Sequence, residues 1–176
     1  LDSNGDWLKT IGGRPQTRMQ AAHAAIKALV TDASLTSGVD FGFAKWASGS
    51  SGFSRWNGNH KTGTGSAIPC STYNCLKVPI YKGGAAAIAK MINQVNPGGG
   101  TDAMAFMRIA SQYYLNSTYT PVDKNSDCQK SYVLVIGDGD WYNHNSAVKT
   151  ARNLYNNHKI GTFTVAFGTG ISSRGL

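Results

Sequence analysis

The chain contains no glutamate, and all nine of its acidic residues are aspartate. Aspartate carries the shorter carboxylate and is common in turns and in metal sites built from oxygen ligands. Five of the nine lie in three short segments, residues 1–6, 98–102 and 136–140. These five are Asp2, Asp6, Asp102, Asp138 and Asp140. The concentration indicates that the three segments converge in space.

Cysteine is also scarce, with three residues in all. Cys70 and Cys75 lie five positions apart, and Cys128 stands alone. Zinc would need a fourth ligand and a more regular spacing, so the pattern disfavours a zinc site. Export of the protein would permit a disulfide, with the third cysteine free or paired elsewhere. The spacing leaves the connectivity open.

Long apolar runs are missing as well: none approaches the ~18 residues that a membrane-spanning helix requires. We therefore expect no membrane insertion. The length of 176 residues suits one domain. Seventeen basic residues outnumber the nine acidic ones, but they are scattered along the chain. Nucleic acid, which favours clustered basic residues, is therefore not an expected partner.

What the sequence does contain is an alternation of helix and strand patterns. Helical spacing of apolar residues covers Pro15 to Val30, Ala85 to Val95, Thr101 to about Leu115 and about Ser146 to Asn156. Strand patterns cover Val39 to Ala47, Tyr132 to Ile136 and Gly161 to Phe167, with a short edge strand possible over Leu76 to Tyr81. Residues 48–82 form an irregular surface insertion. The alternation predicts an α/β fold, a doubly wound, mainly parallel sheet with helices on both faces.

Two details of this prediction concern the core. The run Tyr132 to Ile136 is continuously apolar, which is typical of a central parallel strand buried on both faces. In the last helix we expect four inward side chains, those of Val148, Ala151, Leu154 and Tyr155. Either Thr101 or Asp102 is expected to cap the helix that follows it.

Ligands of such sheets bind outside the carboxyl ends of the strands. The three aspartate-rich segments stand at loop positions of this kind, and glycines between their polar residues permit tight turns. Hard cations such as Mg²⁺ and Ca²⁺ are bound by such oxygens, some directly and some through water. The sequence therefore predicts one divalent-metal site.

In their order and in their residue types, these segments resemble the metal-ion-dependent adhesion site of the von Willebrand factor type A domain. That family combines a D-x-S-x-S segment, a threonine in a Gly-Gly-Thr loop and an aspartate in a (T/S)-D-G loop. Asp2, Thr101 and Asp138 match these motifs, whereas Asn4 and Asp6 replace the two serines. The resemblance spans nearly the whole chain outside the insertion. It implies a metal site formed by these five residues.

The resemblance implies a binding module rather than an enzyme. In this family the open coordination position of the metal takes a carboxylate from a partner, here a protein or host-surface ligand. A second carboxylate at Asp6 would favour Ca²⁺ over Mg²⁺, but the ion stays open between the two. Four residues near the loops could form a rim for the partner: Trp7, Asp140, Trp141 and His144. Packing of the tryptophans against neighbouring loops is the alternative.

A narrower resemblance covers residues 128–141, where a cysteine and a polar pair precede an apolar strand and Asp-Gly-x-Trp. This stretch is similar to the A-type domain of the PilC/PilY family, secreted adhesins associated with type IV pilus tips. It implies an extracellular or cell-surface location, reached through the periplasm, with pilus subunits among the partners. It also implies that both ends of the chain are cut from a larger protein.

Three other interpretations stay open. Asp2-x-Asn4-x-Asp6 matches the start of an EF-hand calcium loop, but Trp7 replaces the expected glycine and the closing glutamate is missing. Clustered aspartates on an α/β sheet also serve metal-assisted phosphohydrolases, although no nucleophile paired with a base is apparent. Finally, the altered serine positions could mark a structural scaffold with a degenerate metal site.

Overall fold

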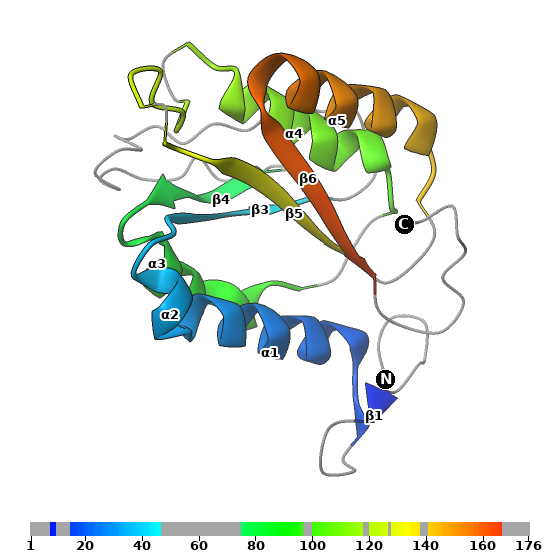
Figure 1. The fold of residues 1–176 in the computed structure, drawn as a ribbon. Helices are drawn as coiled ribbons and strands as arrows, with labels where there is room; N and C mark the ends of the chain where they lie inside the picture. The colour runs from blue at the N-terminus through cyan, green and yellow to red at the C-terminus, as the bar shows by residue number, and fades with distance from the viewer. Residues whose placement is uncertain are drawn as a thin grey trace.

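The computed structural model describes residues 8–9, 15–46, 75–96, 100–117, 120–126, 128–137 and 141–166, which form a mixed α/β fold (Figure 1). The strands are β1 (Leu8–Lys9), β2 (Pro15–Gln16), β3 (Phe41–Lys45), β4 (Cys75–Tyr81), β5 (Ser131–Gly137) and β6 (Ile160–Ala166). The helices are α1 (Arg18–Thr31), α2 (Ala33–Thr36), α3 (Gly84–Met91), the 3₁₀ turn η1 (Ile92–Gln94), α4 (Ala103–Tyr114) and α5 (His144–His158). The predicted α/β class is confirmed.

In the described part of the chain, the strands form three separate pairs. β1–β2 and β3–β4 are antiparallel, whereas β5–β6 is parallel and in register from Ser131↔Ile160 to Gly137↔Ala166. β4 lies within the predicted insertion, where residues 76–81 had been expected as an edge strand. Its buried Pro79 fits beside a single partner strand, because proline cannot donate to a second one. Residues 48–74 of the insertion lie outside the described residues.

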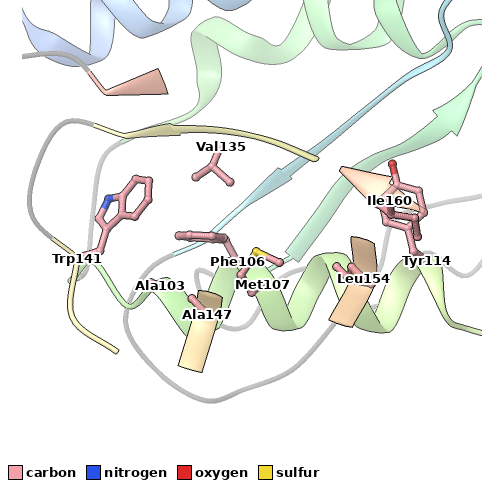
Figure 2. Packing of buried hydrophobic residues seen from close by; sticks show 9 residues of the cluster. All are labelled: Ala103, Phe106, Met107, Tyr114, Val135, Trp141, Ala147, Leu154 and Ile160. Carbon is pink, nitrogen blue, oxygen red and sulfur yellow. The ribbon is translucent and has the colours of Figure 1, made fainter. Parts of the chain in front are cut away.

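The helices lie in two groups on opposite sides of β3, β4, β5 and β6 (Figure 1). α1, α2 and α3 are on one side, where Val30 and Ile88 pack with Val78 and the phenylalanines of β3. α4 and α5 are on the other side and form the larger core with β5 and β6 (Figure 2). Its nine buried members are Ala103, Phe106, Met107, Tyr114, Val135, Trp141, Ala147, Leu154 and Ile160. Trp46, which follows β3, and Ile80 of β4 pack against this second core. The core therefore contacts both the β3–β4 pair and the β5–β6 pair.

One face of the β5–β6 pair is covered and the other is not. Val135 is buried under α4 and α5, but four large apolar side chains of the opposite face are exposed by 46% to 58%: Tyr132, Leu134, Phe163 and Val165. The prediction that this strand is buried on both faces is therefore wrong for the described residues. α1 does not cover this face because it packs on α3 and η1.

Two helices differ from their predicted limits or faces. α1 begins at Arg18 rather than Pro15, because Thr17 and Gln20 form a capping box and Pro15 pairs in β2. In α5, Ala147 and Leu154 are buried and Ala151 packs against the same core. These residues follow helical spacing. Val148 and Tyr155, predicted to face inward, are 44% and 60% exposed because they fall off this stripe.

Two buried tyrosines tie α4 to the strands. The hydroxyl of Tyr113 accepts a hydrogen bond from the backbone N–H of Ile80 at 2.9 Å, and that of Tyr114 donates to the carbonyl of Tyr132 at 2.8 Å. Burial raises the pKa of Tyr113 to about 12, against a weaker opposing effect of the Ile80 bond. Burial and the neighbouring Tyr113 also raise the pKa of Tyr114.

These shifts predict a loss of stability in alkali. In the unfolded chain tyrosine ionises near pH ~10, whereas the folded protein retains these protons, so stability falls as the pH rises from ~10 towards the folded pKa. At pH ~11, Tyr113 should account for about 1 kcal/mol of this loss. Urea unfolding at pH 9 and 11 measures it, with Tyr113→Phe as the comparison. Equal losses in the parent and the variant would contradict the prediction.

Candidate functional site

Backbone hydrogen bonds join the second aspartate-rich segment to a residue that follows the third. The N–H of Tyr142 donates to the carbonyl of Thr101 at 3.2 Å, and the N–H of Ala103 donates to the carbonyl of Tyr142 at 3.0 Å. Together they form an isolated parallel bridge between Asp102 and Tyr142. Thr101 is therefore held beside the chain that leaves the 138–140 segment.

Asp102 is the residue that caps α4. It is only 7% exposed, and its Oδ1 accepts a hydrogen bond from the backbone N–H of Met104 at 2.9 Å. The same oxygen accepts a second bond, at 3.1 Å, from Nδ2 of Asn143. Asp102 thus contacts the first turn of α4 and the residue that precedes α5.

Asn143 has a left-handed backbone, with φ 60° and ψ 21°. Asparagine adopts this conformation more readily than most residues with a side chain. It turns the chain sharply from Tyr142 into α5, while its amide reaches back to Asp102. His144 follows as the half-buried first residue of α5. The conformation of Asn143 therefore determines where α5 starts relative to α4.

The two residues that flank the 138–140 segment pack on each other. Trp141 is 9% exposed and meets Phe106 edge to face, with ring centroids 5.1 Å apart (Figure 2). A Cβ on Gly137 would lie 2.8 Å from Cζ2 of the Trp141 ring, so only glycine fits there. Trp141 thus lies in the core. This agrees with the alternative that it packs inside the fold rather than forming a rim for a partner. Both ends of the segment are held in place.

A lysine joins the end of β3 to the loop that leads to Thr101. Nζ of Lys45 donates a hydrogen bond to the carbonyl of Asn96 at 2.6 Å. Burial lowers the pKa of Lys45, and the nearby Lys77 lowers it further. In Figure 1, β3, β5 and β6 all run towards the side where α4 and α5 begin. The carboxyl ends of these strands and the two helix starts therefore lie at the same side of the fold.

Of the predicted metal ligands, Thr101 is described, and it is half-buried. Asp2, Asn4, Asp6 and Asp138 lie outside the described residues, as do the rim residues Trp7 and Asp140. Within the part of the chain that is described, no three His, Cys, Asp or Glu residues form a group that could hold a metal. What this part supplies to a hard cation is the Thr101 hydroxyl, a suitable oxygen ligand, at the start of α4.

Sequence reasoning missed the contact between Asp102 and Asn143. Asp102 was recognised only as a possible cap, and Asn143 stands three residues before the predicted start of the last helix, near where a capping residue is common. That position was the available signal. It does not identify the partner, which lies 41 residues away in the chain.

No helix in the described ranges is long and apolar enough to cross a membrane. Searches of protein-family models, curated proteins and solved structures found no match to this chain.

Proposed function

We propose that the chain is a metal-dependent binding module that holds Mg²⁺ or Ca²⁺ and, through it, a carboxylate of a partner protein or host-surface ligand. The observation that carries the proposal is the backbone bridge between Asp102 and Tyr142. It holds Thr101 against Tyr142, four residues after Asp138 in the sequence, and this supports a metal site shared by Thr101 and Asp138. Asp2, Asn4 and Asp6 of the first segment complete the proposed ligand set.

The chemistry of these residues supports a binding role. Their side chains are hard oxygen donors, which suit Mg²⁺ and Ca²⁺ better than zinc or copper. A cation that retains a water or an open position can accept a carboxylate from outside. The starts of α4 and α5 also meet here, and their N-terminal ends favour negatively charged groups. A partner carboxylate would therefore meet positive charge from the ion and from both helices.

We further propose that β3–β4 and β5–β6 belong to one doubly wound, mainly parallel sheet. Packing supports this proposal. Trp46, which follows β3, and Ile80 of β4 contact the core that includes Val135 of β5 and Ile160 of β6. The Asp102–Tyr142 bridge then lies where such sheets bind ligands.

The sequence pattern of residues 128–141 supports placing this module in a secreted, type IV pilus-associated adhesin, outside the cell. Within this stretch the apolar strand is β5, and Trp141 packs against Phe106 of α4. Cys128 is exposed at its beginning. Pilus subunits are then among the candidate partners.

Calorimetric titration of the metal-stripped chain with Mg²⁺ and with Ca²⁺ tests the metal site. We expect one saturable site for at least one ion. Thr101→Val removes a hydroxyl while keeping the branched shape, and it should weaken binding about 10-fold or more. Thr31→Val is the matched control, because Thr31 is exposed at the far end of α1 and bonds only within that helix. It should bind as the parent does.

Absence of binding for both ions would refute the module and leave the structural-scaffold interpretation. Binding that survives Thr101→Val unchanged would place the metal elsewhere.

A further inference from the structure

We propose that Asp102 and Asn143 are positioning residues, whose side-chain hydrogen bond orients Thr101 relative to the start of α5 for metal binding. This inference rests on the proposed function. Neither residue belongs to the proposed ligand set. Their contact joins the starts of the two helices that follow the metal loops.

The geometry makes this bond the side-chain link between the two loops among the hydrogen bonds described. Thr101 directly precedes Asp102, and Asn143 lies three residues after Asp140. The backbone bridge holds Thr101 against Tyr142, but a single pair of backbone bonds permits rotation about its axis. The bond from Nδ2 of Asn143 to Oδ1 of Asp102 adds a second attachment next to it. Two adjacent attachments fix orientation as well as distance.

Burial makes the contact firm. Asp102 is 7% exposed, so water competes weakly for its Oδ1, whereas Asn143, which donates to it, is exposed. The carboxylate is held from the other side by the N–H of Met104, which belongs to α4. Asn143 is held in turn by its left-handed backbone at the start of α5. Any shift of one helix start would therefore break a bond to the other.

Metal sites depend on such supporting contacts, and loss of one typically weakens metal binding about 10- to 100-fold. The charge of Asp102 is not what the proposal invokes. An asparagine at position 102 would keep an oxygen for both hydrogen bonds and preserve the helix cap. A serine would keep the cap but would be too short to reach Asn143. Comparing these two variants separates the effect on metal binding of the helix cap, of the Asp102 charge and of the hydrogen bond to Asn143.

The test is Mg²⁺ and Ca²⁺ titration of the parent chain and its variants, with circular dichroism to show that each is folded. Asn143→Gly keeps the left-handed backbone, which glycine adopts without cost, and removes only the amide. We expect Asn143→Gly and Asp102→Ser each to weaken binding about 10-fold, and the double variant to weaken it about 10-fold rather than ~100-fold. Asp102→Asn should stay within about 3-fold of the parent.

Lys159→Gly is the control for a left-handed residue. Lys159 has φ 58° and lies at the opposite end of α5, so its replacement should leave metal affinity unchanged. Variants that bind like a metal-binding parent would overturn the positioning role and leave the proposed function standing. An Asp102→Asn variant as weak as Asp102→Ser would also overturn it, because charge would then be the cause. A parent that binds neither ion would refute the proposed function and this inference together.

Discussion

Replacement of Asp138 by alanine should abolish measurable binding of Mg²⁺ and Ca²⁺, a loss of more than about 100-fold. Loss of a supporting residue around a metal site already costs about 10- to 100-fold, and removal of a charged ligand exceeds that range. Asp138 directly follows Gly137, which packs closely against the ring of Trp141. The fold should survive, since the change deletes atoms rather than adding them.

Asp40→Ala is the matched control for this variant. Asp40 is exposed and immediately precedes β3, at the end of that strand opposite to Lys45, and its replacement removes the same charge. Metal-dependent stability gives a second readout, because an ion at 100 times its Kd stabilises a folded protein by about 2.7 kcal/mol. The parent and Asp40→Ala should gain this stability, and Asp138→Ala should not. Equal metal affinity in all three proteins would remove Asp138 from the site.

Replacement of Gly84 by alanine should destabilise the protein by about 3 kcal/mol, the upper end of the usual cost of overpacking. Gly84 is the buried first residue of α3. A Cβ there would lie 1.8 Å from the backbone carbonyl oxygen of Phe41 in β3. No rotamer relieves a clash with backbone, so α3 and β3 would have to separate. Helix propensity alone predicts the opposite sign, a gain of about 1 kcal/mol.

Gly38→Ala is the comparison that isolates the clash. A Cβ on Gly38 would meet no atom within 4 Å, and the residue is exposed. Alanine there should stabilise the protein by about 0.5 kcal/mol, because it restricts the unfolded chain. Urea midpoints of the two variants and the parent measure both effects. A Gly84→Ala variant as stable as the parent would mean that α3 does not pack this closely on β3.

The sequence predicted the elements whose signals are local. Helical spacing of apolar residues located α4, in which Met107 and Tyr113 are buried. The apolar run around Val135 identified β5, and the alternation near Phe43 identified β3. Capping preferences narrowed the start of α4 to two residues, of which Asp102 is the cap. Each of these predictions depends on neighbours within one or two turns.

Features set by distant contacts could not be predicted in this way. Whether the second face of β5 is covered depends on which helices pack there, and in the described residues Tyr132 and Leu134 are exposed. The limits of α1 were missed because Pro15 suits the first turn of a helix as well as a short strand. The partner of Asn143 lies in another loop, so no local pattern indicates it.

For the candidate site, too, part of the prediction rests on local sequence and part depends on distant contacts. Composition indicated the aspartate-rich segments, and the resemblance to the von Willebrand A domain selected Thr101. The structure places Thr101 beside Tyr142, which follows the third segment. The first segment, with Asp2 and Asp6, lies outside the described residues, so its place at the site stays a prediction. Convergence of all three segments on one ion is therefore the central claim.

Titration of isotopically labelled, metal-stripped chain with Mn²⁺, followed by nuclear magnetic resonance, tests this claim most directly. Mn²⁺ accepts the same oxygen ligands as Mg²⁺ and broadens the signals of nearby nuclei. We predict that one equivalent broadens the amides of Thr101, Asp138 and the first segment together, that Mg²⁺ or Ca²⁺ reverses this, and that Lys159 stays sharp. Broadening confined to exposed carboxylates such as Asp123, with Thr101 unaffected, would contradict the account.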